Sequence, residues 1–181
     1  MRILFVCTGN ICRSPMAERM LNHQTDFVPA GVDAPVVASA GTGAMNGSAM
    51  HPLTEQALRE RGIDTAGFAS RMLTPAIVES ADLVLCMTRE HRKLAQQAVP
   101  VRWKRIFTLS EFVAGLEVGH GVSALDDESI RPRLDANSPE WDILDPMGQP
   151  LEAFESTAEK LWPLVESVAR WVMSRPGDDA R

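Results

Sequence analysis

The fold of this 181-residue chain is decided by residues 3–15, Ile-Leu-Phe-Val-Cys-Thr-Gly-Asn-Ile-Cys-Arg-Ser-Pro. The first five residues form a short apolar run, which is typical of a strand buried on both faces of a sheet. Ser14 is a favourable helix N-cap and Pro15 suits the first helical position, so a helix is predicted to begin there. The residues between Cys7 and Ser14 therefore form a tight loop at the carboxyl end of a strand, where open α/β sheets bind their ligands.

The same alternation of apolar runs and helical patterns continues along the chain. It predicts further strands at 36–40, 83–87 and 105–108, helices at 14–23, 52–62, 74–80, 89–98 and 151–173, and one helical turn at 110–114. Because Pro163 interrupts the last helix, a kink is expected near Lys160. Strands that alternate with helices form a parallel sheet. The expected fold is a three-layer α/β domain, a four-stranded parallel sheet with helices on both faces.

A single domain is predicted over residues 1–174, followed by a flexible tail at 175–181. Residues 115–143 break the pattern, with three glycines, two prolines and no clear periodicity. This segment carries a charge of −5 out of the total net charge of −6, so the acidity is local. We interpret the segment as an acidic loop insertion, because structureless stretches of this length are usually lids or solvated loops.

The composition argues against several classes of protein. Hydrophobic residues make up 45% and charged residues 23%, as in a soluble globular protein, and the negative charge disfavours a basic nucleic-acid binder. Three cysteines are too few for a secreted disulfide framework, and no apolar run has the length of a membrane span. We expect a cytoplasmic protein without nucleic-acid or membrane partners. The histidines lack metal-ligand spacing and are predicted to be surface or capping residues: His23, His51, His91 and His120.

The loop from Cys7 to Arg13 carries the candidate chemistry. Its backbone N–H groups and the N-terminus of the following helix can converge on an anion, which favours a thiolate at Cys7. Gly9 and Asn10 tolerate left-handed backbone angles. Arg13 offers a planar fork for two oxygens of a phosphate. The loop lacks the nucleotide P-loop and Rossmann patterns, so it is predicted to be an oxyanion cradle with a nucleophile at its floor.

Residues 6–18, Val-Cys-Thr-Gly-Asn-Ile-Cys-Arg-Ser-Pro-Met-Ala-Glu, resemble the active-site signature of the low-molecular-weight protein tyrosine phosphatases. The resemblance extends through 39–41, 81–87 and Asp145-Pro146. It implies hydrolysis of protein phosphotyrosine and aryl phosphates without a metal or cofactor. It assigns Cys7 to nucleophilic attack that forms a phosphocysteine, Arg13 to phosphoryl binding and Asp145 to proton donation. The phosphate-binding loop would also contain Thr8, Gly9, Asn10, Ile11, Cys12 and Ser14.

The resemblance also implies roles for supporting residues. Ser14 would hydrogen-bond the thiolate, and Ser39 would join Asn10 in holding the loop. Cys12 matches a second cysteine of the family, and a reversible disulfide with Cys7 would protect the nucleophile from over-oxidation. Cys86, on a predicted buried strand, is expected to be a core residue.

The predicted substrate pocket departs from the family pattern. Tyrosine-specific members usually have an aromatic residue after Asp-Pro, where this chain has Met147, and residues 42–47 contain no aromatic. Met45 and Met147 are candidates for a softer pocket wall, because methionine adapts to ring faces. Trp141 is a candidate platform, but anchoring of the loop is the favoured interpretation of this residue.

Three alternatives to a phosphotyrosine phosphatase were open. Residues 83–88 and 107–112 also resemble bacterial protein-arginine phosphatases, but those enzymes typically carry a threonine where this chain has the apolar Ile11, which favours a flat ring. An arsenate reductase needs a second cysteine seven residues after Cys86, where Lys93 stands. A phosphoprotein-binding module without activity would be expected if Asp145 were missing. Phosphorylated proteins are the expected partners.

Overall fold

The computed structural model describes residues 1–26, 34–118, 135 and 137–174. Four strands, β1 (Arg2–Cys7), β2 (Val36–Gly41), β3 (Leu83–Cys86) and β4 (Ile106–Thr108), form one parallel sheet in the order β2-β1-β3-β4. The sheet confirms the predicted α/β fold. In the register of β1 with the edge strand β2, Cys7 at the end of β1 lies opposite Gly41.

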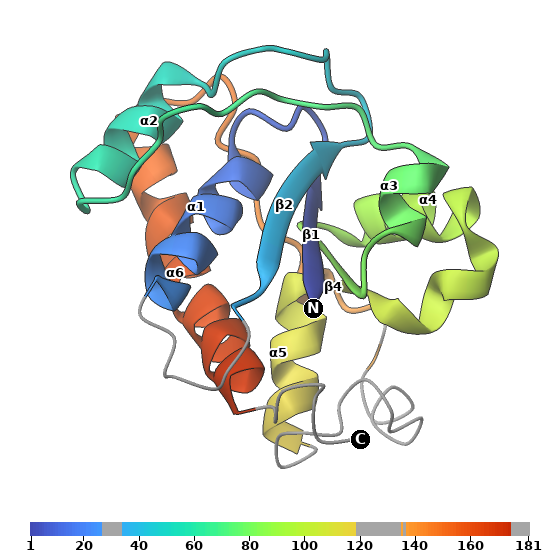
Figure 1. Cartoon of the computed structure of the whole chain (residues 1–181). Coiled ribbons are helices and arrows are strands. Elements are labelled where there is room, and N and C mark those ends of the chain that lie inside the picture. Colours follow the sequence, from blue (N-terminus) through green and yellow to red (C-terminus); the bar gives the residue numbers. More distant parts are fainter. Residues whose placement is uncertain (27–33, 119–134, 136, 175–181) are drawn as a thin grey trace.

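Helices cover both faces of the sheet (Figure 1). On one face, the larger apolar core includes the fully buried Phe5, Phe112 and Phe154. On the other face, a smaller core includes Leu4, Val84 and other residues of low exposure. The larger core lies under α1 (Arg13–Thr25), α2 (Pro52–Arg59), α5 (Leu109–Val118) and α6 (Leu151–Met173), and the smaller core lies under α3 (Pro75–Glu79) and α4 (Arg89–Ala98).

Strand β1 separates the two cores. Successive side chains of a strand point to opposite faces. Ile3, Phe5 and Cys7 accordingly belong to the larger core, and Leu4 and Val6 belong to the smaller one. The continuous apolar run of the sequence is therefore explained by burial on both faces. It also directs the side chain of Cys7 toward the face that α1 covers.

Some local predictions differ from the structure. Helix α1 begins at Arg13, with Cys12 in the capping position, because the hydroxyl of Ser14 forms hydrogen bonds inside the loop instead of capping the helix. Helix α5 extends from Leu109 to Val118, beyond the predicted single turn, since Phe112 and Val113 pack into the core. The first residues of the predicted insertion 115–143 are therefore helical.

The far end of the same segment also has regular structure, because a 3-10 helix, η3, spans Pro139–Trp141. The intervening residues 119–134 and 136, and the predicted tail at 175–181, lie outside the described residues. Helix α6 continues through Pro163 to Met173. Within the described ranges, no helix combines the length and the apolar character needed to cross a membrane.

Candidate active site

The loop that follows β1 has the compact shape that its sequence predicts. Of the two residues expected to adopt left-handed angles, Asn10 does so, with φ of 53°, and Gly9 does not. The loop packs directly against Gly41 at the end of β2. A Cβ atom on Gly41 would lie 2.4 Å from the carbonyl oxygen of Thr8 and 2.8 Å from the backbone nitrogen of Asn10. Glycine is therefore required at this position for steric reasons.

Cys7 lies at the floor of the loop and is buried. Its Sγ is 3.0 Å from Ser14 Oγ, and the backbone N–H of Asn10 donates to it at 3.3 Å. Asn10 in turn donates from Nδ2 to Ser14 Oγ at 2.9 Å and to Ser39 Oγ at 2.7 Å. The hydroxyl of Ser14 and the backbone N–H of Asn10 are thus placed to donate to a thiolate at Cys7, which only accepts hydrogen bonds.

A buried polar network supports Asn10 from behind. Ser39 Oγ donates to Glu18 Oε2 at 2.5 Å, and the backbone N–H of Arg71 donates to Asn10 Oδ1 at 2.9 Å. Arg71 Nε also donates to the carbonyl oxygen of Ser39 at 2.7 Å. Burial raises the pKa of Glu18, and the hydrogen bond from Ser39 partly offsets that effect. The network joins α1, β2 and the segment after α2 to the loop, and so fixes the side chain of Asn10.

Arg13 is buried, and its guanidinium reaches from the first residue of α1 into the loop mouth. Nη1 donates to the carbonyl oxygen of Ile143 at 3.0 Å, and Nη2 donates to the carboxylate of Asp145 and, at 3.5 Å, to Thr8 Oγ1. Its Nε is buried and has no hydrogen-bond partner among the described residues. A buried donor of this kind is satisfied when an oxyanion binds.

Asp145 lies at the mouth of the site, and its side chain is 43% exposed. The segment that leads to it is attached to the sheet, because the backbone N–H of Ile143 donates to the carbonyl oxygen of Met87 at 2.8 Å. Beyond it, the backbone N–H of Met147 donates to Asp145 Oδ1 at 3.2 Å. The structure thus brings together Cys7 and Arg13, which the loop sequence predicts to carry the chemistry, and Asp145, which the family resemblance adds to them.

His91, at the start of α4, was predicted to be a surface or capping residue, and that prediction is wrong. Its ring is buried between two threonine hydroxyls, with Nε2 at 2.9 Å from Thr8 Oγ1 and Nδ1 at 2.8 Å from Thr88 Oγ1. Burial, reinforced by the positive charge of Arg13, lowers the pKa of His91 to about 4. A neutral imidazole therefore links the loop after β1 to α4. By contrast, His51 caps α2 as predicted, accepting from the N–H of Leu53.

The other two cysteines are buried and reduced. Burial raises the pKa of Cys12 to about 11, so this side chain is a neutral thiol within the loop. Cys86 belongs to the core on the α4 face, as predicted, and burial raises the pKa of its thiol as well.

The predicted pocket residues are less closely tied to the site. The side chains of Met45 and Met147 are exposed. Trp141 lies in η3, and its indole Nε1 donates to the carbonyl oxygen of Asp135 at 2.5 Å. This hydrogen bond favours the loop-anchoring interpretation of Trp141 over the substrate platform.

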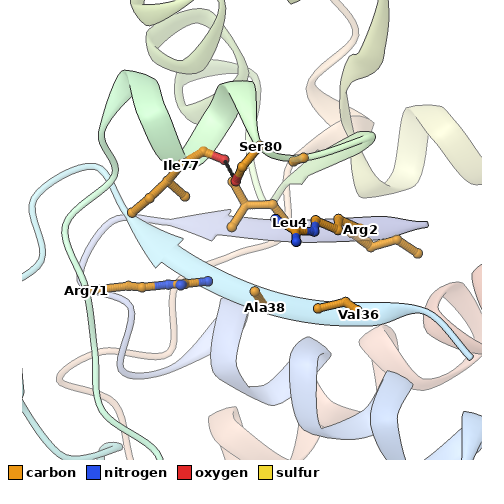
Figure 2. Close-up of a pocket in the computed structure, with 9 residues that line it drawn as sticks. Arg2, Leu4, Val36, Ala38, Arg71, Ile77 and Ser80 are labelled. Atoms are coloured by element: carbon orange, nitrogen blue, oxygen red, sulfur yellow. Dashed lines mark hydrogen bonds between the residues drawn. The ribbon is translucent and has the colours of Figure 1, made fainter.

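A separate cavity of about 150 Å³ lies against the sheet on the side of α3 (Figure 2). Because Leu4 belongs to the smaller core, this cavity opens on the face opposite to the side chain of Cys7. Its connection to the site runs through Arg71, which also contacts Asn10 and Ser39. The cavity is lined by Arg2, Ile3, Leu4, Val36, Ala38, Arg71, Ile77, Ser80 and Ala81.

Sequence comparison relates the chain to known phosphatases. Residues 2–123 match the model of a family described as low molecular weight phosphotyrosine protein phosphatase. The protein-arginine-phosphatase of Bacillus subtilis is 33% identical over 170 residues, which cover 94% of this chain and 95% of that protein. The low molecular weight protein-tyrosine phosphatase A of Mycobacterium tuberculosis is 38% identical over 129 residues, or 71% and 74% of the two chains.

Solved structures give the same relationship. An arginine phosphatase mutant with a phosphorylated active-site serine superposes with a TM-score of 0.76 at 30% identity, covering 96% of this chain and 97% of that one. A low molecular weight protein tyrosine phosphatase from T. tengcongensis superposes with a TM-score of 0.74 at 32% identity, with coverage of 94% and 98%. The similarity therefore extends over nearly the whole chain.

Proposed function

Because the chain belongs to the low molecular weight phosphotyrosine protein phosphatase family, we propose that it hydrolyses phosphotyrosine in proteins, and simple aryl phosphates, through a phosphocysteine intermediate. The observation that carries the proposal is the convergence of Cys7, Arg13 and Asp145 at one loop mouth. A nucleophile, an oxyanion ligand and a carboxyl group are the three components that metal-independent phosphoryl transfer to cysteine requires.

In the first half-reaction, the loop N–H groups and Arg13 bind the phosphoryl oxygens. Cys7 Sγ attacks phosphorus as the bond from phosphorus to the phenolic oxygen breaks, and Asp145 gives its proton to that oxygen. A phosphoryl group at Arg13 competes with Asp145 for the same guanidinium. Substrate binding therefore releases the Asp145 carboxylate from Arg13. The released carboxylate takes up a proton from solvent, and this is the proton that it gives to the leaving oxygen.

In the second half-reaction, the Asp145 carboxylate accepts a proton from water. The water oxygen attacks phosphorus, the sulfur–phosphorus bond breaks, and inorganic phosphate leaves. Ser14 and Asn10 donate to the Cys7 thiolate that is regenerated. The similarity to a solved mutant whose active-site serine is phosphorylated supports a phosphoryl-enzyme intermediate.

Ile11 supports an aromatic substrate over a guanidinium. It is half-buried and packs against the larger core, so it presents an apolar side chain in the phosphate-binding loop. A second candidate function is hydrolysis of phosphoarginine in proteins. Relatives named protein-arginine-phosphatase, from Bacillus subtilis and Geobacillus stearothermophilus, match 94% and 93% of this chain.

The test measures kcat/KM on one peptide that carries either phosphotyrosine or phosphoarginine. We expect faster hydrolysis of phosphotyrosine, no turnover by Cys7→Ser, and a loss of about 10²–10⁴-fold for Asp145→Asn. Cys86→Ala is the matched control, because Cys86 lies in the core of the opposite face, and it should remain active. Turnover by Cys7→Ser would refute the mechanism, and faster hydrolysis of phosphoarginine would replace the proposed substrate by the second candidate.

A further inference from the structure

The segment that carries Asp145 is held three residues earlier, at Asp142, by Arg89. The backbone N–H of Arg89 donates to Asp142 Oδ1 at 2.7 Å, and Nη2 donates to Oδ2 at 2.9 Å. Nε lies 3.3 and 3.2 Å from the two oxygens, so the carboxylate is gripped by both the side chain and the backbone of one residue. Arg89 Nη1 also donates to the carbonyl oxygen of Asn137.

This pair lies directly beside the other contacts that hold the segment. Arg89 is the first residue of α4, and Met87, just before it in the chain, accepts from the backbone N–H of Ile143. The carbonyl oxygen of Ile143 accepts from Arg13. Asp142 is thus attached to the start of α4, and Ile143 is attached both to the residue that follows β3 and to the phosphoryl-binding arginine.

Beyond Ile143 the chain has little to hold it before Asp145. The side chain of Leu144 is 81% exposed, so it contributes no packing that would orient Asp145. Ile143 is buried, but burial of its side chain does not fix the backbone dihedral angles of Leu144. The N–H and the carbonyl oxygen of Ile143 are hydrogen-bonded to Met87 and Arg13. The contact of Arg89 with the Asp142 carboxylate fixes the residue from which this stretch begins.

The electrostatics of the pair keep the Asp142 carboxylate ionised beside Arg89. Burial opposes the ionisation of Asp142, but the hydrogen bonds and charge of Arg89 outweigh it and lower the pKa of Asp142. The two side chains remain 33% and 28% exposed. A planar fork on a carboxylate defines geometry closely.

We propose that Arg89, through Asp142, is a positioning residue that holds Asp145 where it protonates the leaving oxygen. The inference rests on the proposed function, because it assumes that Asp145 is the proton donor. If Asp145 is misplaced, the rate should fall most for substrates whose leaving group most needs protonation. Phenolate is more basic than p-nitrophenolate and needs the proton more.

The experiment measures kcat/KM on phenyl phosphate and p-nitrophenyl phosphate, because this parameter reports the steps up to departure of the phenol. Asp145→Asn should lose more on phenyl phosphate than on p-nitrophenyl phosphate. Arg89→Ala should also lose more kcat/KM on phenyl phosphate than on p-nitrophenyl phosphate, but the losses should be smaller, about tenfold on phenyl phosphate. Arg89→Lys, which keeps the charge but not the fork, should lie between Arg89→Ala and the wild type.

The double variant separates positioning from general damage. In an Asp145→Asn background, Arg89→Ala should cause no further selective loss on phenyl phosphate, since residues that act as a unit are not additive. Arg59→Ala is the matched control, because it removes an arginine that pairs with Glu55 on α2, and it should leave both rates unchanged. Thermal melting of each variant monitors folding, and Asp142→Asn repeats the test from the partner's side if Arg89→Ala does not fold.

The outcomes distinguish the two proposals. If Arg89→Ala loses equally on both substrates, or loses as much in the Asp145→Asn background as alone, the positioning role is wrong and the proposed function stands. If Asp145→Asn itself shows no dependence on the leaving group, the proton-donor role fails, and the role of Arg89 fails with it.

Discussion

Replacing His91 by glutamine should reshape the dependence of stability on pH. In the folded protein the pKa of His91 is lowered from 6.5 to about 4, mainly by burial and then by the charge of Arg13, although Asp145 and Asp142 act in the opposite direction. In the unfolded chain the ring takes up a proton near pH 6.5. The unfolded state therefore binds more protons between these values, and stability rises with pH across this window.

The size of the effect follows from the two pKa values. Each unit of difference corresponds to 1.36 kcal/mol. The contribution of the neutral ring is fully present above pH 6.5, and about 3 kcal/mol of it is lost as the pH falls through 4. Glutamine cannot titrate, yet its amide can still reach Thr8 or Thr88. Glu18, whose pKa is raised, contributes with the opposite sign but does so in both proteins, so it cancels in the difference.

The assay is urea unfolding of the wild type and His91→Gln at several pH values from 7 to 4, with free energies from linear extrapolation. Relative to the variant, the wild type should lose about 3 kcal/mol over this range. Thr74→Ala is the control, because it loses the cap of α3 at every pH but leaves every contact of the imidazole in place, so it should follow the wild-type slope. A difference between wild type and His91→Gln that stays constant with pH would show that the folded protein does not hold His91 as a neutral imidazole.

Three further predictions concern the loop itself. Gly41→Ala should lower the free energy of unfolding by about 1–3 kcal/mol in thermal or urea unfolding, because the added methyl group would overlap the carbonyl oxygen of Thr8. Full stability and activity of this variant would contradict the close packing of the loop on Gly41. Ile11→Thr should change the ratio of kcat/KM for phosphoarginine over phosphotyrosine upward by about tenfold, and an unchanged ratio would remove Ile11 as a specificity determinant. In wild-type protein treated with mild peroxide, Cys7 should form a disulfide with Cys12 that added thiols reverse. In Cys12→Ser, mass spectrometry should instead find sulfinic acid on Cys7. Sulfinic acid on Cys7 in both proteins would exclude the protective disulfide.

The parts of the fold that the sequence predicts are those that depend on neighbouring residues. The apolar run of β1 and the polar loop after it are contiguous in the sequence. A strand buried on both faces is apolar at every position, so the run can be recognised from the sequence alone. The end of α5 was missed for the opposite reason. Its helical continuation depends on Phe112 and Val113 finding the core, which the glycine-rich sequence that follows does not reveal.

The same distinction separates the predicted site residues from the missed ones. Cys7 and Arg13 lie in one local motif, and Asp145 was found only through its resemblance to a family pattern. His91 and Thr8 are 83 positions apart, and nothing in the local sequence of α4 shows that the ring is buried against the loop. The Arg89–Asp142 pair spans 53 positions and was likewise invisible, since an Arg at a helix start is ordinarily a solvated charge.

The ion pair between Arg13 and Asp145 has a consequence for how tightly the site holds any anion. A carboxylate fixed to the same chain is a tethered competitor, present at an effective concentration set by its short connection to the rest of the fold. Each anion that enters must displace it, so the measured affinity is the intrinsic affinity of the cradle reduced by the fraction of molecules in which the pair is closed. Self-competition of this kind weakens the grip on inorganic phosphate, which must leave before the next turnover.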